Sequence, residues 1–322
     1  MKIAIFGTGG VGGYAGARLA AAGHEVHFIA RGPHLEAIRR DGLRVESIHG
    51  DLHIRPARAT DRPAEVGPAD WVLCAVKTWQ LPEALAVMSP LLDPGTAVLP
   101  IQNSVEAADR VAEALGPEHV LGGAAWIRAE IADPGLIRHA AIEPRIVMGE
   151  LDGGPSPRAD ALQRALQTAG VRAEVSSEIR SVIWSKFLFI ASFSGVGAVT
   201  RADAGETRAL TPTRALLRAA MEEVGALARA HGIRLSPDVI GETLRFVDEL
   251  PAGGTSSMQR DLLAGRPSEL EDQSGAVVRL GRAAGVPTPV HDFLYAALLP
   301  QERRARSAVA PVAELAADRN VP

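Results

Sequence analysis

The sequence predicts an α/β N-terminal domain over residues 1–172 and an all-helical C-terminal domain over residues 173–322. In the first half, short continuous apolar runs alternate with helix-forming segments, as buried parallel strands and their crossover helices do. A glycine-rich turn joins the first apolar run to the first helix. Beyond residue 178 such runs are lacking, and helical segments follow one another. The length of 322 residues also suits two domains of about 150 residues each.

The composition excludes several classes of protein. The apolar fraction of 47% and the charged fraction of 22% fit a globular chain rather than a disordered one. The formal net charge is −4, so we expect no nucleic-acid partner. The chain has one cysteine, Cys74, which excludes an intrachain disulfide and a zinc–thiolate cluster. Cys74 lies in an apolar run and is interpreted as a core residue. The nine histidines lack ligand spacing, and we expect no metal site.

The chain shows no feature of export or membrane insertion. The apolar run after Met1 is too short for a secretory signal, and glycines break it. No uncharged run approaches the roughly 18 apolar residues of a membrane span. We therefore expect a cytoplasmic protein without a membrane partner.

The individual elements follow from the same patterns. Strands are expected over residues 2–7, 25–30, 71–76 and 97–101, with helices over 14–22 and 82–92. Runs near Val120 and over 136–139 and 145–149 indicate antiparallel or edge strands that extend the sheet as a meander. Further helices are expected over 179–195, 212–231, 236–249, 268–284 and 289–299. Thr211-Pro212 and Ser236-Pro237 are typical helix starts. The Ala-, Arg- and Pro-rich tail over 305–322 is expected to fray.

The glycine-rich turn predicts a dinucleotide site. It reads Gly7-Thr8-Gly9-Gly10-Val11-Gly12, a G-x-G-x-x-G pattern between a strand and a helix, which is typical of a Rossmann-type domain. The first glycine permits the tight turn, the second lets the backbone approach a pyrophosphate, and the third lets the helix pack close to the strand. The helix N-terminus then offers N–H groups to the phosphates. The alternative is a glycine-rich turn that binds nothing.

The residues at the strand ends favour NADP over NAD. An NAD site usually has an acid after the second strand, whereas this chain has Arg31, and a cation suits a 2′-phosphate. Lys77 and Asn103 follow two later strands, and the carboxyl ends of such strands face the ligand crevice. Lys77 is a candidate for the phosphate or adenosine end, and Asn103 for the nicotinamide ribose or the substrate. The alternatives are a solvated arginine, a surface lysine and a turn-forming asparagine.

A lysine in the helical half is a candidate proton donor. Lys186 lies in the apolar segment Trp184-Ser185-Lys186-Phe187-Leu188-Phe189-Ile190. A ketone reductase needs an acid for the alkoxide that forms as hydride arrives, and burial lowers the pKa of an ammonium toward neutrality. The alternative is a lysine that extends its ammonium to water at the surface.

Taken together, these motifs resemble the ketopantoate reductase (2-dehydropantoate 2-reductase) family over almost the whole chain. The matching residues are Gly7-x-Gly9-x-x-Gly12, Arg31, Val76-Lys77-Thr78-Trp79-Gln80, Gln102-Asn103, Trp184-Ser185-Lys186-Phe187, Thr255-Ser256-Ser257-Met258-Gln259-Arg260-Asp261, Gly265-Arg266-Pro267-Ser268-Glu269-Leu270 and Gly285-Val286-Pro287-Thr288-Pro289. The resemblance implies a Rossmann domain followed by a helical domain. It also implies NADPH-dependent reduction of a 2-oxo acid to the 2-hydroxy acid, on the route to pantothenate.

The resemblance also implies roles for particular residues. Lys186 would be the catalytic lysine and would touch the substrate, while Asn103 would contact both cofactor and substrate. Ser257 would hold the substrate carboxylate, with a helix cap as the alternative, and Glu269 would lie near substrate and nicotinamide, with a first-turn helix acid as the alternative. Arg31 and Lys77 would favour the 2′-phosphate. A homodimer is an open expectation.

The substrate side departs from the family pattern. The family usually has Asn four and eight residues after the lysine, on the same helical face, where this chain has Ile190 and Ser194. Another substrate-facing Asn corresponds to Ala204. In addition, Ser104 replaces a Gly and Ser274 replaces an Asn. Ser194 retains a hydroxyl that could bind substrate.

Three hypotheses follow from this mixture of matches and departures. The first is a ketopantoate-type reductase, and the second is an NADPH-dependent reductase of the same fold for a different, bulkier or more apolar, 2-oxo acid or ketone. The third is an NADP-binding protein without turnover, which a buried proton donor at Lys186 disfavours.

Overall fold

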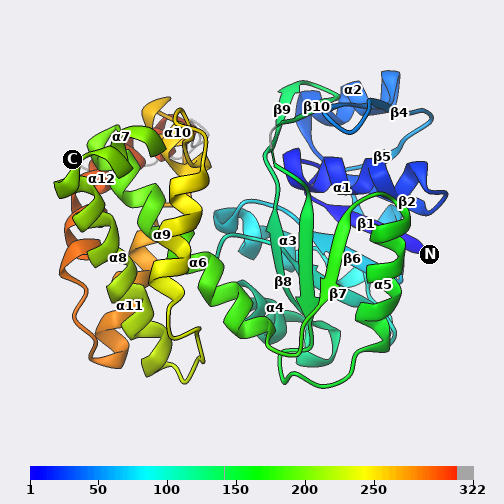
Figure 1. The fold of residues 1–322 in the computed structure, drawn as a ribbon. Coiled ribbons are helices and arrows are strands. Elements are labelled where there is room, and N and C mark those ends of the chain that lie inside the picture. The colour runs from blue at the N-terminus through cyan, green and yellow to red at the C-terminus, as the bar shows by residue number, and fades with distance from the viewer. Residues whose placement is uncertain (141, 310–322) are drawn as a thin grey trace, which may run out of the picture. The chain divides into compact units, whose positions relative to one another are not determined.

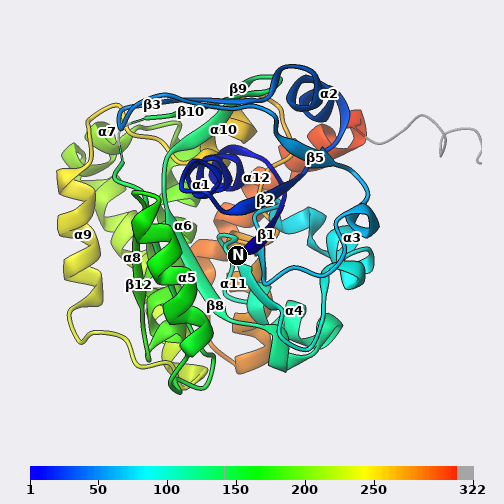
Figure 2. The ribbon, with the colours of Figure 1, turned by 90° about the vertical axis from the view of Figure 1, so that its right-hand side faces the viewer.

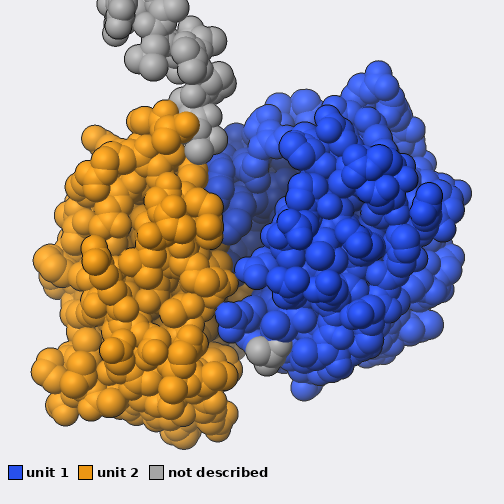
Figure 3. All heavy atoms as spheres, turned by 90° about the horizontal axis from the view of Figure 1, so that it is seen from above, with its two compact units in different colours: residues 1–183 blue, residues 184–322 orange. Residues whose placement is uncertain are grey.

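The computed structural model describes residues 1–140 and 142–309, which belong to two compact units, 1–183 and 184–322 (Figure 3). The units part at Ile183, inside a long helix, whereas the sequence suggested a boundary after residue 172. The α/β class of the first part and the helical class of the second are confirmed. In the described part of the second unit no strand is present.

The first unit is built on a parallel sheet of five strands in the order β5-β2-β1-β6-β7 (Figure 1). These strands are β1 (Lys2–Phe6), β2 (Glu25–Ile29), β5 (Arg58–Thr60), β6 (Trp71–Cys74) and β7 (Ala97–Pro100). All residues of β6 and β7 are buried, which explains why these strands are continuously apolar in the sequence. The carboxyl ends of β1, β2, β6 and β7 therefore lie along one edge of this sheet.

Five α-helices of the first unit surround or connect its sheets. They are α1 (Gly10–Ala21), α2 (Gly32–Asp41), α3 (Leu81–Ala86), α4 (Ala107–Leu115) and α5 (Pro157–Thr168). Helix α1 lies between the parallel sheet and a second, four-stranded sheet, and one apolar core joins the three layers (Figures 1 and 2). Another core, on the opposite face of the parallel sheet, includes residues of α3 and α4.

Two smaller sheets complete the first unit. The second sheet has the order β4-β3-β10-β9, and the third has the order β12-β11-β8. Their strands are β3 (Leu43–Ser47), β4 (Leu52–Ile54), β8 (Gly122–Trp126), β9 (Ala129–Asp133), β10 (Leu136–His139), β11 (Arg145–Gly149) and β12 (Arg172–Val175). A single parallel bridge between Val98 and Val120 links the first sheet to the segment before β8. The predicted meander is only partly present. The pairs β8–β11 and β9–β10 are antiparallel as expected, but they belong to two separate sheets rather than to an extension of the parallel sheet, and β10 is parallel to β3.

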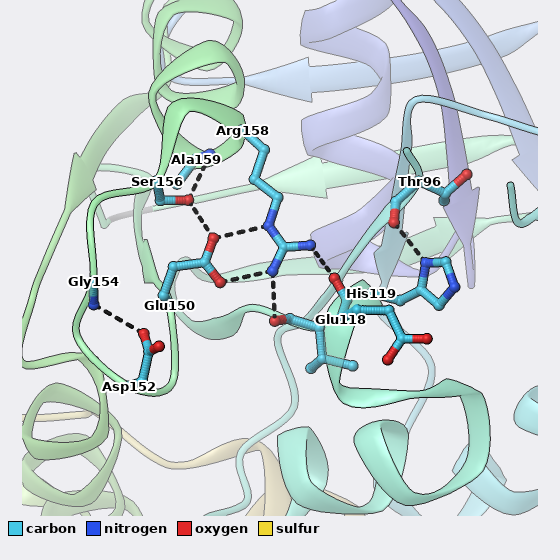
Figure 4. Close-up of polar contacts among 10 residues, drawn as sticks. Thr96, Glu118, His119, Glu150, Asp152, Gly154, Ser156, Arg158 and Ala159 are labelled. Carbon is cyan, nitrogen blue, oxygen red and sulfur yellow. Dashed lines mark hydrogen bonds and ion pairs between the residues drawn. The ribbon is translucent and has the colours of Figure 1, made fainter. Parts of the chain in front are cut away.

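Arg158 on α5 joins three segments of the first unit (Figure 4). Its guanidinium donates to the Glu150 carboxylate, with 2.6 Å from Nη2 to Oε2, and to the carbonyl oxygens of Glu118 and Val120. Burial raises the pKa of Glu150, but the hydrogen bonds and charge of Arg158, together with the Ser156 hydroxyl, outweigh it, so the net pKa is lowered. The Ser156 hydroxyl also caps α5 by accepting from the N–H of Ala159. This cluster therefore fixes the approach of α5 to the third sheet.

The second unit is a bundle of helices. They are α6 (Ile179–Thr200, which begins in the first unit), α7 (Ala204–Ala209), α8 (Thr211–Ala230), α9 (Val239–Glu249), α10 (Ser257–Leu263), α11 (Ser274–Ala284) and α12 (Pro289–Val309). Helix α8 packs against α7, α9, α11 and α12. A bidentate ion pair between Arg214 and Asp248 adds a polar link from α8 to α9.

Several predicted boundaries were wrong. Helix α1 begins at Gly10 rather than Tyr14, because the last glycines of the turn are already helical. The expected helix over 82–92 is the short α3 followed by a 3-10 turn. Ser236-Pro237 does not start a helix, since α9 begins at Val239 after a turn. The expected helix over 268–284 begins only at Ser274. Helix α12 continues to Val309, so residues 305–309 of the expected frayed tail are helical, and the rest of that tail lies outside the described residues.

Candidate active site

The glycine turn of the first unit has the geometry that a dinucleotide fold needs. Gly7 has φ +101°, and a Cβ there would lie 2.6 Å from the backbone nitrogen of Val76. A Cβ on Gly12 would lie 2.2 Å from the carbonyl oxygen of Gly7, so a side chain there would push α1 off the strand. At Gly9 a Cβ would meet nothing within 4 Å, which leaves the backbone open to an approaching ligand. The turn is therefore closed on the sheet side and open at Gly9, directly before α1.

The other residues of the turn divide between anchoring and exposure. The Thr8 hydroxyl donates to the carbonyl oxygen of Ile29 at 3.0 Å, and the N–H groups of Gly7 and Thr8 reach the same oxygen. These bonds hold the turn to β2. The backbone N–H groups from Gly9 to Val11 are left for phosphates, because N–H groups at the start of a helix have no intrahelical acceptor. A Cβ on Gly10 would lie 2.1 Å from the carbonyl oxygen of Ala129 in β9, a packing constraint that the motif alone does not reveal.

Arg31 and Lys77 lie beyond the carboxyl ends of β2 and β6. Arg31 precedes α2, its side chain is 64% exposed, and its Nη1 lies 3.1 Å from Oε1 of Glu83. The nearest acid to Arg31 is therefore on α3, and sequence reasoning missed it because 52 residues separate the pair. The Nζ of Lys77 lies 5.6 Å from the ring centroid of Trp79. Two cations thus lie beyond the ends of the two strands that flank β1, and a carboxylate partly neutralises Arg31.

The segment after β7 is braced against β6. The Gln102 amide donates to the carbonyl oxygens of Cys74 and Val76 at 3.0 and 3.2 Å. Asn103 follows directly and is partly buried, at the same sheet edge as the glycine turn. Cys74 is fully buried and burial raises the pKa of its thiol to about 11, so it is a core residue rather than a nucleophile.

Lys186 lies in the middle of α6 in the second unit, and the structure excludes an ammonium extended into solvent. The residue is only 9% exposed. Burial lowers the pKa of its ammonium from the ordinary value of 10.5 to about 8, and the charge of Glu269 opposes part of that decrease. A lysine with such a pKa holds its proton at neutral pH and gives it up readily, as a general acid should.

Glu269 is buried at 4% exposure and lies in the turn before α11, not in a helix as predicted. The reason is Glu302 on α12, which sequence reasoning missed. Its carboxylate accepts the N–H of Ser268, and the Ser268 hydroxyl donates to it at 2.5 Å. These bonds hold the backbone in a turn and fix the residue next to Glu269. On its other side, Glu269 accepts a long hydrogen bond from Gln273, 3.4 Å from Nε2 to Oε2.

The remaining substrate candidates are spread over three helices of the second unit. Ser257 is the first residue of α10, and Ser256, not Ser257, caps that helix by accepting from the N–H of Gln259. The Ser194 hydroxyl is buried without a hydrogen-bond partner among the described residues. Ile190 is partly buried between Lys186 and Ser194 on one face of α6, and Ala204 is fully buried at the start of α7. The roles of these residues remain predictions.

Over residues 1–140 and 142–309, no group of three or more His, Cys, Asp and Glu could hold a metal ion. Helix α6 is long and apolar enough to cross a membrane by length and composition, although it carries Arg180 and Lys186. However, 61% of that stretch is buried inside the structure, as in the core helix of a globular protein.

Comparisons with known proteins decide the family. The family profile "Ketopantoate reductase PanE/ApbA" matches residues 3–153, and its C-terminal counterpart, "Ketopantoate reductase PanE/ApbA C terminal", matches residues 178–302. The chain belongs to the ketopantoate reductase family. It is 35% identical to a 2-dehydropantoate 2-reductase of Mesorhizobium japonicum, over 92% of this chain and 96% of that protein.

The chain is also similar to solved structures. A PanE/ApbA family ketopantoate reductase from Ralstonia eutropha matches with a TM-score of 0.87 and 34% identity, over 95% of this chain and all of that one. A D-mandelate dehydrogenase in a ternary structure with NADH and anilino(oxo)acetate matches with a TM-score of 0.86 and 25% identity, over 95% and 100% of the two chains. The family is thus one of oxidoreductases that act on CH–OH groups with a nicotinamide cofactor, and this chain is such an enzyme.

Proposed function

We propose that this enzyme reduces a 2-oxo acid to the 2-hydroxy acid with NADPH and that Lys186 supplies the proton. The observation that carries the proposal is the burial of Lys186 in the middle of an apolar helix. Burial lowers the pKa of its ammonium to about 8, and the charge of the buried Glu269 opposes part of that decrease. Burial of such a charged group costs stability, so its presence points to a function. A proton donor for a developing alkoxide is the function that fits. An NADP-binding protein without turnover would not need it.

The first unit fits a dinucleotide at its glycine turn. The open backbone at Gly9 and the N–H groups up to Val11 would hold the pyrophosphate, and Arg31 with Lys77 would hold a 2′-phosphate. No carboxylate follows β2 directly to bind the ribose hydroxyls of NAD, which supports NADP. When bound, NADPH supplies the hydride. Asn103 would contact the nicotinamide ribose and the substrate.

In the second unit, Lys186 would act on the substrate oxo group. Its ammonium would donate a hydrogen bond to the carbonyl oxygen and transfer a proton to that oxygen as the carbon accepts the hydride, leaving the neutral amine. Glu269 would keep the ammonium charged between turnovers through its negative charge. Ser257 would hold the substrate carboxylate, and the unpartnered Ser194 hydroxyl would take a second polar group.

Two substrate identities follow from different observations. The likeness to 2-dehydropantoate 2-reductases supports ketopantoate, and hence a place in pantothenate synthesis. Ile190 and Ala204, where the family resemblance leads one to expect amides, support a more apolar 2-oxo acid, because a buried polar group without a partner costs about 1–3 kcal/mol. The structural likeness to a D-mandelate dehydrogenase agrees with the second identity.

The test is NADPH oxidation, followed by absorbance, with ketopantoate beside a panel of other 2-oxo acids and with NADH in parallel. Turnover with at least one 2-oxo acid and a preference for NADPH supports the proposal. Binding of NADPH with no turnover on any acid contradicts it. We also propose that the functional partner is a small-molecule substrate and that the enzyme is cytoplasmic. We further propose that the enzyme is a homodimer, which size-exclusion chromatography with light scattering would test.

A further inference from the structure

Aromatic side chains gather beside Lys186 in a chain that has few of them. The whole sequence has seven phenylalanines, and three of them, Phe187, Phe189 and Phe193, lie on α6. Lys186, Phe189, Ile190 and Phe193 occupy positions i, i+3, i+4 and i+7, so they share one helical face. The rings of Phe189 and Phe193 stack with centroids 5.3 Å apart and an interplanar angle of 18°.

A fourth ring reaches this face from another helix. Phe246 on α9 meets Phe189 edge to face, with centroids 5.0 Å apart and an interplanar angle of 87°. It is nevertheless 41% exposed, and α9 directs other residues, including Leu244 and Val247, into the core. An exposed phenyl ring forgoes part of the stabilisation that burial would give it. Phe246 therefore packs against Phe189 while leaving part of its ring free.

The rest of the same face is also poor in polar groups. Ile190 separates Lys186 from Ser194, and the partly buried Phe189 and Ile190 flank the lysine on its C-terminal side. The Ser194 hydroxyl, two turns from Lys186, is buried and has no hydrogen-bond partner within residues 1–140 and 142–309. A proton donor thus lies at one end of a surface whose chemistry is aromatic and aliphatic.

Resting on the proposed reduction of a 2-oxo acid, we propose that Phe189 and Phe246 form an aromatic subsite that receives an aryl group attached close to the oxo carbon of the substrate. Phe193 is only 3% exposed and supports this subsite by stacking on Phe189. Aromatic rings bind other rings in stacked and edge-to-face arrangements, both of which this cluster already contains. Phe246, whose ring has free surface, is the specificity-determining residue. The preferred substrates are aryl 2-oxo acids rather than short polar ones.

The test compares Phe246→Ala with Phe293→Ala. Phe293 is a matched control, because it is 58% exposed in the same unit but on α12. Phenylglyoxylate and pyruvate serve as the aryl and small substrates with NADPH. We expect wild type and F293A to prefer phenylglyoxylate, and F246A to lose about tenfold in kcat/KM for phenylglyoxylate with little change for pyruvate. Unchanged melting temperatures verify that both variants fold.

Binding separates this inference from the proposed function. In the presence of NADP⁺, which cannot reduce the acid, calorimetric titration should show phenylglyoxylate binding to wild type and about tenfold weaker binding to F246A. Binding that depends on Phe246 without turnover on any acid would contradict the reductase and retain the subsite. A wild type that favours pyruvate, an equal loss for both substrates in F246A, or no binding of phenylglyoxylate would overturn the subsite.

Discussion

The buried carboxylate of Glu302 holds Ser268 by two hydrogen bonds to one oxygen, 3.0 Å from the main-chain nitrogen and 2.5 Å from the hydroxyl. Arg306 completes the contact, because its Nε lies 2.6 Å from the other carboxylate oxygen and its Nη2 donates to the Ser268 carbonyl. Since Ser268 precedes Glu269, this link between α12 and the turn before α11 determines where the Glu269 carboxylate lies.

Replacing Glu302 with Gln tests that link. The amide retains the shape but loses the charge and one acceptor, so the free energy of unfolding should fall by about 1–3 kcal/mol. In the proposed reaction, kcat should fall as Glu269 becomes less well placed. Urea denaturation measures the first effect and NADPH oxidation the second. Glu222→Gln on the exposed face of α8 is the control. A variant as stable and active as that control would show that the Glu302 contact is dispensable.

The glycine turn separates folding from ligand binding in two alanine variants. Gly12→Ala places a Cβ 2.2 Å from the Gly7 oxygen, so the protein should be clearly destabilised. Gly9→Ala meets nothing within 4 Å, so stability should be retained, whereas NADPH affinity should fall about tenfold because the methyl group occupies the approach of the pyrophosphate. Thermal unfolding and fluorescence titration with NADPH measure the two effects. Unchanged NADPH affinity in G9A would argue against this turn as the pyrophosphate site.

Arg31 and Glu83 should control the choice of coenzyme in opposite directions. Arg31→Ala should weaken NADPH binding about tenfold or more and leave NADH nearly unaffected, because only NADPH has a 2′-phosphate for the guanidinium. Glu83→Gln removes the carboxylate that lies 3.1 Å from Arg31 and should strengthen NADPH binding. Titrations at constant ionic strength measure both, since exposed charges are screened by salt. Equal losses for NADPH and NADH in R31A would contradict the assignment.

The lowered pKa of Lys186 predicts a pH profile. The ammonium is the active form for reduction, so kcat should be level below pH 8 and should fall above about pH 8, where the amine forms. The sign for stability is opposite. Since the folded pKa lies below the unfolded value of 10.5, burial of the charged lysine costs stability below pH 8, and this cost is relieved as the pH rises from about 8 to 10.5.

The change in stability is measurable against Lys186→Met, which has no titrating group at this position. Between pH 8 and 10.5 the free energy of unfolding of wild type should rise relative to that of the variant, after correction for other groups. A wild-type kcat that stays level to pH 10 would mean that the proton donor titrates elsewhere.

Local signals in the sequence predicted the parallel sheet and the glycine turn. A continuous apolar run identifies a strand buried on both faces, such as β6, and a glycine before a helix identifies the turn at Gly7, since both depend on neighbouring residues. The burial of Lys186 was suggested by its apolar flanks, but the structure was needed to exclude an exposed ammonium. Its partner Glu269 was suggested only by the family resemblance.

Contacts between distant segments were not predictable in the same way. The sequence predicted a helix over 268–273, but the segment is a turn because Glu302, more than thirty residues later, binds the backbone N–H of Ser268. The pairing of Arg31 with Glu83 and the contact of Phe246 with Phe189 likewise join separate elements. Ser236-Pro237 carried a local helix-start signal, yet a turn intervenes before Val239, because capping preferences are weaker than tertiary packing.

The most direct test of the account is to compare Lys186→Ala with wild type in two measurements on the same samples, NADPH binding by fluorescence titration and NADPH oxidation with the best 2-oxo acid. We expect K186A to bind NADPH as tightly as wild type, because the proposed dinucleotide site lies in the first unit. We expect kcat to fall by at least about a hundredfold through loss of the general acid. A K186A variant that retains wild-type kcat would contradict the central claim that Lys186 supplies the proton.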